Sequence, residues 1–410
     1  QRPLLTRRHD KGGPVERLTG VTKTHDWGSP TLIPTFLGVE EDGEPWAEQW
    51  FGAHPLGPAG VAGGDLRERI SADPTGSLGP STRLMLGDEL PYLVKLIAPA
   101  RALSLQVHPG RALAAEGFAA EEEQGPPVGE ATRIFQDTTH KPEMLYAITH
   151  FEALVGFAVR RQARERLEGL DCALASRLSR RLLLAAGRGV RPVVAWILDP
   201  EDGPTATEIT DFAAACQRRL ESGDSPDAGL DETVVRLQRE FPGQASIAMC
   251  FLMNHLVLAP GEAVYVPTGT VHSYQRGLGL EVMANSDNVI RAGLTNKHVE
   301  AKLFLETASF DGLPPTRIAP EHPVIGINLF RSPVEDFELS VAAPDTAGSP
   351  HPLPLRGTGP RILVGLEGEV EAEVASGKTM LSRGEAVFAP DSDGPILLRG
   401  AGEVAQVSVP

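Results

Sequence analysis

The sequence contains few cysteines. Its three, Cys172, Cys216 and Cys250, lie far apart, and no two of them form a Cys-x-x-Cys motif. This pattern excludes the paired disulfide framework of small secreted proteins. We therefore expect the three to be small buried hydrophobic residues in a protein of a reducing compartment.

Positive charge is also scarce. The 38 lysines and arginines are outnumbered by 54 aspartates and glutamates, which leaves a formal net charge of -16. A general nucleic-acid or anionic-membrane binder would need a basic field, so the composition argues against both. If the ligand is an anion, its positive contacts must be local.

Long hydrophobic runs are absent. The longest, at 247–259, is interrupted by Asn254 and His255 and is shorter than the roughly 20 residues that span a bilayer. The first residues, with Arg7 and Arg8, lack the apolar core of a signal peptide. We therefore expect a cytoplasmic enzyme without a transmembrane segment.

The composition favours a mainly β protein with an α-helical insertion. A length of 410 residues predicts two or three domains, and the 43 glycines and 35 prolines favour many short strands and turns. Residues 1–17 are charged and contain glycine, so we expect a frayed lead-in, with order beginning near Leu18.

The helical portion is predicted at 153–254. Five leucines recur at steps of three and four residues, which is typical of an amphipathic helix: Leu167, Leu170, Leu174, Leu178 and Leu182. The same pattern returns at 212–220 and 233–241. This segment contains none of the candidate metal ligands, which come before and after it in the chain.

A ten-residue repeat links two strand-rich parts of the chain. Residues 258–267 and 381–390 are identical at six of ten positions, with a constant offset of 123. This Gly-Glu-Ala turn followed by a short strand is typical of a small double-sheet barrel. Pro395 stands where the first copy has His272, and 361–374 alternates Val and Glu. We predict that 322–410 forms a jelly-roll barrel without metal.

Candidate metal ligands follow an alternating strand at 104–109. Ser104, Gln106 and His108 would point to one face of this strand. With Glu143 and His272, the residues Gln106 and His108 would supply two nitrogens and two oxygens, which suits one divalent ion such as zinc. Lys95 lies in a buried strand at 90–98 and is costly to bury unless it faces a polar pocket, so we place it in the same cavity.

These motifs resemble the type I mannose-6-phosphate isomerases. The resemblance runs in family order from about 20 to 310, and the tail fits the family's C-terminal barrel. The matching segments are Trp27-Gly28, 48–55, 104–109, 140–144, 260–263, 271–274 and 281–295.

The resemblance implies two cupin barrels and a helical domain. The catalytic cupin would comprise 18–152 and 255–321, the helical domain 153–254, and a second, metal-free cupin 322–410. It further implies a cytoplasmic monomer with one zinc per chain that acts on a sugar phosphate and binds neither nucleic acid nor membrane. The activity would interconvert mannose 6-phosphate and fructose 6-phosphate and serve mannose metabolism and GDP-mannose biosynthesis.

The resemblance also assigns residues. The zinc ligands of the family fall on Gln106, His108, Glu143 and His272, and its other active-site contacts fall on Ser104, Lys141, Tyr274, Glu281, Asp287, Arg291 and Lys297. The chain departs from the family pattern at 135–140 and at Ser273, which bears on fine-tuning of the substrate site and not on the ligands.

Chemistry suggests roles for several of these groups. Isomerisation moves a proton between C1 and C2 through an enediolate, so Lys141 and Glu281 suit proton exchange, and Arg291 suits charge stabilisation. Ser104 and Lys297 would bind the phosphate. The sequence leaves open which group takes the C2 proton.

Three alternatives compete with this interpretation. One is a broader aldose–ketose isomerase. Another is an iron-dependent cupin oxygenase, although Gln106 as a fourth ligand speaks against it. The third is a non-catalytic sugar-phosphate sensor, for which Lys141, Glu281 and Arg291 beside the metal would be superfluous.

Overall fold

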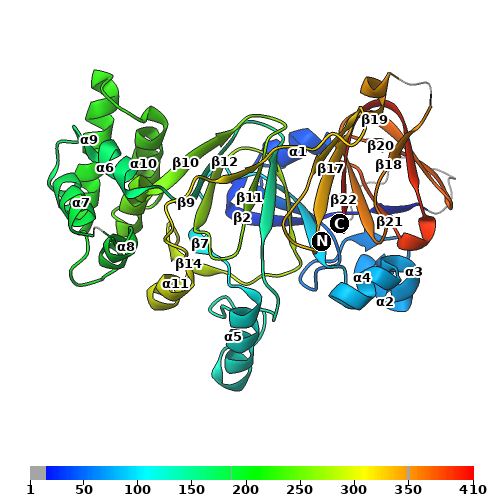
Figure 1. The fold of residues 1–410 in the computed structure, drawn as a ribbon, viewed down its shortest axis with the longest axis horizontal. Helices are drawn as coiled ribbons and strands as arrows, with labels where there is room; N and C mark the ends of the chain where they lie inside the picture. The colour runs from blue at the N-terminus through cyan, green and yellow to red at the C-terminus, as the bar shows by residue number, and fades with distance from the viewer. Residues whose placement is uncertain (1–14, 186, 349–350) are drawn as a thin grey trace.

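The protein is elongated, with helices at one end and two β-barrels beside them (Figure 1). The computed structural model describes residues 15–185, 187–348 and 351–410. Both the mainly β fold class and the α-helical insertion are confirmed. Among the described residues, no helix is long and apolar enough to cross a membrane.

The first barrel consists of two antiparallel sheets. The seven-stranded sheet has the order β15-β11-β8-β13-β6-β3-β2, and the five-stranded sheet has the order β10-β9-β12-β7-β14. The strands of the larger sheet are β2 (Val21–Ser29), β3 (Trp46–Phe51), β6 (Tyr92–Ile97), β8 (Glu143–Ala147), β11 (Ala263–Val266), β13 (Gly279–Ala284) and β15 (Thr316–Ile318). Those of the smaller are β7 (Leu105–Val107), β9 (Phe151–Phe157), β10 (Met253–Leu258), β12 (His272–Arg276) and β14 (Ile290–Gly293).

The second barrel is built on two long paired strands. Its sheet has the order β1-β21-β19-β22-β17-β16, with β18 on β22 and β20 on β19. Its strands are β1 (Glu16–Leu18), β16 (Ile327–Phe330), β17 (Glu338–Ala342), β18 (Leu353–Leu355), β19 (Arg361–Val374), β20 (Gly377–Ser382), β21 (Ala386–Ala389) and β22 (Ile396–Ser408).

The start of the chain corrects a prediction. Residues 1–14 of the predicted lead-in lie outside the described residues, but Glu16–Leu18 is not frayed: it forms β1 and pairs with β21 of the second barrel. Local sequence could not reveal this pairing, because its partner lies some 370 residues away.

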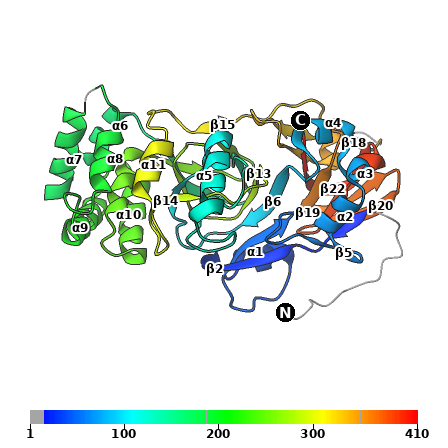
Figure 2. The same ribbon diagram turned by 90° about the horizontal axis from the view of Figure 1, so that it is seen from below.

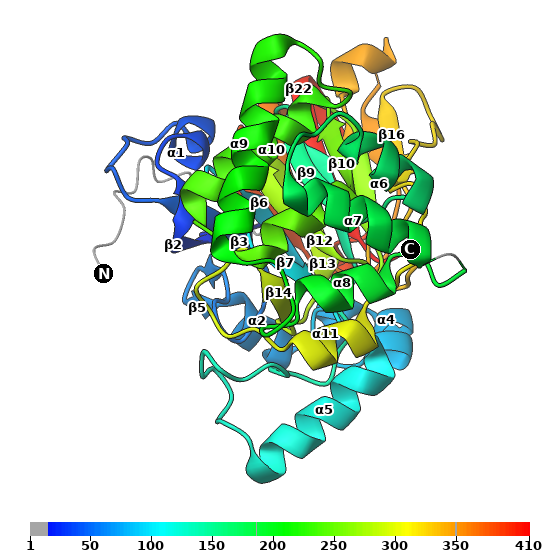
Figure 3. The ribbon, with the colours of Figure 1, turned by 90° about the vertical axis from the view of Figure 1, so that its left-hand side faces the viewer.

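The helical segment packs on the outer face of the five-stranded sheet. Figure 3 views the molecule from this side. Apolar side chains of the helices and of the strands, such as Leu105, Val107 and Leu154, form one core there. The elements are α6 (Arg160–Leu167), α7 (Ala173–Leu184), α8 (Arg191–Ile197), α9 (Ala206–Ser222), α10 (Ala228–Glu240) and the 3-10 helix η1 (Ala245–Leu252).

Two details of the helical prediction were wrong. The leucines from Leu167 to Leu182 do not form one helix, because α6 ends at Leu167 and α7 begins at Ala173. The buried Arg219 of α9 donates to the carbonyls of Arg166 and Glu168, which satisfies the end of α6. The predicted boundaries 153 and 254 also fall inside the strands β9 and β10.

The remaining elements surround the barrels. Helix α5 projects below the first barrel in Figure 1 and crosses the middle of the molecule in Figure 2. These elements are α1 (Leu32–Leu37), the hairpin β4 (Gly60–Val61) and β5 (Gly64–Asp65), α2 (Leu66–Ala72), α3 (Pro74–Leu78), α4 (Pro80–Leu86), α5 (Arg111–Gln124), α11 (Ala301–Thr307), η2 (Pro344–Ala347) and η3 (Asp391–Asp393).

The two barrels pack sheet against sheet through an apolar core. Met144 and Tyr146 of β8 belong to the same buried cluster as Phe330, Phe337 and Leu339 of the second barrel. Strand β8 therefore has one face toward the second barrel, while its first residue, Glu143, belongs to the candidate metal centre of the first.

Candidate metal centre and active-site cavity

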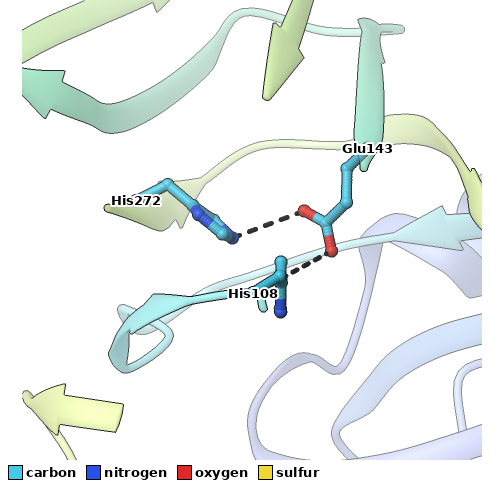
Figure 4. A group of neighbouring side chains, drawn as sticks. All are labelled: His108, Glu143 and His272. Carbon is cyan, nitrogen blue, oxygen red and sulfur yellow. Dashed lines mark ion pairs between the residues drawn. The ribbon is translucent and has the colours of Figure 1, made fainter. Parts of the chain in front are cut away.

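Three predicted ligands meet at the inner face of the first barrel. Figure 4 shows His108, Glu143 and His272 pointing toward one another. The Nε2 atoms of His108 and His272 lie 3.0 and 3.4 Å from the two carboxylate oxygens of Glu143. Glu143 opens β8, His272 opens β12 and His108 follows β7, so three strands converge here.

Backbone carbonyls orient both imidazoles. Nδ1 of His108 lies 2.7 Å from the carbonyl oxygen of Asn288, and Nδ1 of His272 lies 2.9 Å from that of Thr270. A carbonyl only accepts, so each Nδ1 carries the proton and each Nε2 presents a lone pair to Glu143. Burial lowers the pKa of His108 to about 4, so this imidazole is neutral near neutral pH.

This arrangement calls for a cation. The buried Nε2 of His108 has no hydrogen-bond partner, although a carboxylate oxygen lies 3.0 Å away. Two lone pairs at this distance repel each other, and a metal ion between them would turn the repulsion into coordination. The donor set of two imidazole nitrogens and a carboxylate fits a divalent ion such as zinc.

Gln106 lies beside this group. It pairs directly with His272 across the sheet, and its Nε2 is 3.3 Å from Nε2 of His272. Its Oε1 accepts a hydrogen bond from the Ser104 hydroxyl, 3.3 Å away. Rotation of the amide by 180° would present the oxygen to a metal held by the other three residues.

A cavity of about 390 Å³ opens beside the metal centre. His108 and His272 are almost fully buried and do not line it. The other ten residues assigned to the site from the sequence all line this cavity: Lys95, Ser104, Gln106, Lys141, Glu143, Tyr274, Glu281, Asp287, Arg291 and Lys297.

Comparisons with known proteins agree with this geometry. The family model of the phosphomannose isomerase type I catalytic domain matches residues 15–160. Mannose-6-phosphate isomerase of Escherichia coli is 31% identical over 411 aligned positions, which cover 96% of this chain and 99% of the relative. The chain belongs to the type I mannose-6-phosphate isomerase family.

Similarity within this family extends to plants and to solved structures. Mannose-6-phosphate isomerase 1 of Arabidopsis thaliana is 30% identical, with coverage of 95% of this chain and 92% of the relative. A zinc-bound mannose 6-phosphate isomerase has a TM-score of 0.85 at 28% identity, covering 96% of this chain and 99% of that one. The apo form from Salmonella typhimurium gives the same four values.

A buried charge network surrounds the cavity of this family member. The Lys95 ammonium lies 3.5 Å from carboxylates of Glu48 and Glu281, and Glu281 pairs with Lys95 across the sheet. Burial alone would lower the pKa of Lys95, but the two carboxylates outweigh it and raise this pKa above its ordinary value.

Glu281 is a buried carboxyl whose pKa lies near neutral pH. Burial, together with repulsion from Glu143, raises its pKa to about 7, although Lys95 and Lys141 act in the opposite direction. For Glu143 burial also opposes ionisation. The nearby His108 and Lys141, whose ammonium is 3.4 Å away, outweigh this and keep the pKa of Glu143 well below its usual value.

Tyr274 lies on β12 and Arg291 on β14, the two strands that flank β7 in the five-stranded sheet. The Tyr274 hydroxyl donates to Glu143, 3.1 Å away, and burial raises its pKa well above the usual value, so it stays protonated. Arg291 pairs with Gln106 across the sheet and is half-buried. Burial lowers the pKa of Arg291, and the nearby Asp287 acts in the opposite direction.

Sequence reasoning missed several residues at the site. Trp50 lines the cavity, donates to Glu48 (2.8 Å) and lies under the Lys95 ammonium, 4.8 Å from the ring centroid. Trp27 lines the cavity too. Their position in the family motifs was a usable signal.

The supporting Asn288 and the cavity residue Phe241 were also missed. Asn288 lies in the 281–295 motif, but its backbone role gives no sequence signal. Phe241, directly after α10, lines the cavity, so the helical segment contributes to the cavity although it contains none of the metal ligands.

Proposed function

We propose that the chain is a zinc-dependent isomerase that interconverts mannose 6-phosphate and fructose 6-phosphate through an enediolate. The observation that carries this proposal is the pair of imidazole lone pairs directed at Glu143, beside a cavity that also holds Glu281, Lys141 and Arg291. The names of the relatives supply mannose 6-phosphate, and fructose 6-phosphate is the partner that the family resemblance implies.

The residues that would hold zinc are His108, Glu143 and His272, with Gln106 after rotation of its amide. Zinc bound there would act as a Lewis acid that polarises the oxygens at C1 and C2 of the sugar. The outward hydrogen bonds of both histidines to backbone carbonyls would keep their Nε2 atoms in place.

Proton transfer is assigned to Glu281 and Lys141. A carboxyl with a pKa of about 7 can both accept and return a proton near neutral pH, which the shift of a proton between C1 and C2 requires. Lys95 and Tyr274 complete the polar wall around it. Arg291, which keeps its charge throughout, would stabilise the enediolate.

The phosphate is assigned to Ser104 and Lys297. Both line the cavity and would donate to phosphate oxygens, and Asp287 would orient sugar hydroxyls. These local donors would answer an anionic substrate in an otherwise acidic chain. We further propose a cytoplasmic monomer that serves mannose metabolism and GDP-mannose biosynthesis.

The test is an anaerobic assay with mannose 6-phosphate and fructose 6-phosphate, before and after chelation and zinc replacement. Interconversion that chelation abolishes and zinc restores is the expected result. A requirement for oxygen would favour an oxygenase, and binding without turnover would favour a sensor. Equal rates on mannose and mannose 6-phosphate would favour a broader isomerase.

A further inference from the structure

A carboxylate of the second barrel reaches the catalytic side of the first. Asp336 lies in the loop between β16 and β17, and its Oδ2 is 3.0 Å from Nε2 of His140. Arg111, the first residue of α5, places Nη2 2.8 Å from the same imidazole nitrogen and 3.5 Å from Oδ1 of Asp336. With its one proton donated to Asp336, Nε2 has no lone pair left for Arg111, so the guanidinium pairs with the carboxylate and not with the imidazole. Three segments distant in sequence therefore meet at one imidazole.

The position of Asp336 is determined by the core between the barrels. Phe330 precedes the loop and Phe337 follows Asp336, and both rings are almost fully buried in that core. Phe330 packs edge-on against Tyr146 of β8, with ring centroids 5.5 Å apart. The Ser332 hydroxyl donates to the Phe337 carbonyl and closes the loop. Asp336 is 5% exposed, so its buried charge is stabilised by His140 and Arg111 and not by water.

His140 directly precedes Lys141, and the two side chains have different surroundings. Lys141 lines the cavity, and its ammonium is 3.4 Å from Glu143. His140 contacts Asp336 and Arg111 instead. A shift of His140 would therefore move the backbone from which Lys141 extends.

The segment that carries His140 and Lys141 is also held by the first barrel. The carbonyl of Thr139 accepts hydrogen bonds from the Asn288 side chain (2.9 Å) and the Ser286 hydroxyl (3.1 Å). Asn288 also orients His108 through its backbone carbonyl. The segment 139–141 is thus attached at Thr139 to the first barrel and at His140 to Asp336 of the second barrel.

We propose that Asp336 is a positioning residue for Lys141, so that the metal-free barrel completes the active site of its neighbour. The carboxylate holds His140, and His140 fixes the backbone that carries Lys141 into the cavity. This inference rests on the proposed function, in which Lys141 exchanges protons. It assigns the second barrel a part in the reaction beyond packing.

The primary test compares Asp336→Ala with the more conservative Asp336→Asn, which keeps one acceptor for His140. Asp336→Ala should lower kcat about tenfold or more while KM changes less than about threefold and zinc content is kept. Asp336→Asn should recover part of the loss. Glu335→Gln, an exposed carboxylate of the same loop, is the matched control and should retain wild-type kinetics.

A double-mutant cycle separates positioning from simple stabilisation of the interface. If Asp336 acts through His140, adding Asp336→Asn to His140→Ala should lower kcat no further. Independent, additive losses would overturn the proposal, as would a wild-type kcat in folded Asp336→Asn and Asp336→Ala proteins.

Hydrogen exchange gives a readout that does not depend on activity. Amides of 138–141 should exchange at least about tenfold faster in Asp336→Ala than in the wild type, with a smaller increase in Asp336→Asn and no change in Glu335→Gln. Unchanged exchange in Asp336→Ala would overturn the proposal. A wild-type protein that fails to isomerise mannose 6-phosphate would instead overturn the proposed function, while exchange would still decide how the loop is held.

Discussion

The two barrels share one turn-and-strand unit and differ in the next strand of the chain. Gly261 and Gly384 occupy the same turn position with φ of 88° and 82°, values that favour glycine. Each turn leads into a four-residue strand, β11 or β21, 123 positions apart. The repeat found in the sequence is therefore a repeat in the structure.

The equivalence includes contacts that the sequence comparison could not find. Glu262 and Glu385 each accept a hydrogen bond from the backbone N–H three residues earlier, at 2.8 and 2.9 Å. Each also pairs with an arginine of an added edge strand, Arg317 of β15 or Arg17 of β1. The edge strands come from opposite ends of the first barrel's sequence, yet their registers match.

The difference lies in the residue that introduces this next strand. His272 opens β12 and is fully buried in the metal centre, whereas the equivalent Pro395 is exposed and precedes β22. Behind Pro395 the interior of the second barrel is filled by Ile396, Leu398 and their apolar neighbours. The comparison teaches that the turn and edge strand preserve the scaffold, while the chemistry depends on a few separate positions.

The largest expected effect comes from removing His272, the metal-ligating residue that the first barrel has and the second lacks. His272→Ala should lose most of its zinc and lower kcat about 10³-fold or more, because one imidazole of the set is gone. Metal analysis and the isomerase assay measure both. His140→Ala, outside the ligand set, should keep its metal. Two tightly held ions per wild-type chain would contradict the prediction that the second barrel binds no metal.

Charge stabilisation in the first barrel is tested next. Arg291→Ala should keep its zinc and fold but lose kcat by about 10²-fold, as when a preorganised charge is removed from a transition state. Steady-state kinetics and solvent-deuterium incorporation at C1 and C2 measure the effect, with Arg291→Lys as the charge-retaining control. A near-normal kcat would transfer this role to zinc and Lys141.

Phosphate binding should respond less strongly. Lys297→Ala should raise KM for mannose 6-phosphate about tenfold or more, since one charged hydrogen bond contributes about 1.5–3 kcal/mol. Turnover of unphosphorylated mannose should hardly change, so the ratio of kcat/KM for mannose 6-phosphate to that for mannose should fall. Equal loss on both sugars would contradict the phosphate assignment.

The barrels also differ in what they pack against, and this gives a pH prediction. Beside the apolar core that joins the first barrel to the helices lies an ionic cluster: His255 Nε2 is 3.0 Å from Glu152, and Nδ1 is 3.8 Å from Asp227 at the start of α10. Burial lowers the pKa of His255, but Asp227 and Glu152 outweigh it and raise the pKa to about 9. A raised pKa stabilises the fold below the unfolded value of 6.5, and this is lost as pH rises through 9.

His255→Gln should therefore destabilise the protein by about 1–3 kcal/mol at pH 6 and by less at pH 9.5. Below pH 4.5 another loss begins in both proteins, because the unfolded chain takes up a proton at Glu152 that the folded protein, in which this pKa is lowered to about 2, does not bind until the pH falls to that value. Urea unfolding across this range measures the difference. His322→Gln, an exposed histidine, is the control. A pH-independent difference would contradict the ionic account.

The smallest effect is expected in the second barrel. Pro395→His should bind no second ion, because the exposed position has only an apolar interior behind it. Stability should change by no more than about 0.5 kcal/mol. Metal analysis of this variant beside the wild type provides the test. A second tightly held zinc would show that the residue at position 395 alone decides whether the second barrel binds metal.

The sequence by itself determined the local features of this protein. Alternation at 104–109 predicted that Gln106 and its neighbours Leu105 and Val107 point to opposite faces, and in the structure Gln106 lines the cavity while Leu105 and Val107 pack in the core shared with the helices. The Gly-Glu-Ala turn predicted matching units in both barrels, and the spaced leucines predicted helices. Each signal spans a few residues, so it survives without knowledge of the rest of the fold.

Only the tertiary structure decided how distant segments meet. The pairing of β1 with β21, the break between α6 and α7 under Arg219, and the contact of Asp336 with His140 join positions 53 to about 370 residues apart. Backbone carbonyls of Asn288 and Thr270 orient the histidines, and carbonyls are the same in every residue. Such contacts depend on which arrangement buries the apolar faces and satisfies the polar groups of the whole chain together, and no local pattern encodes that balance.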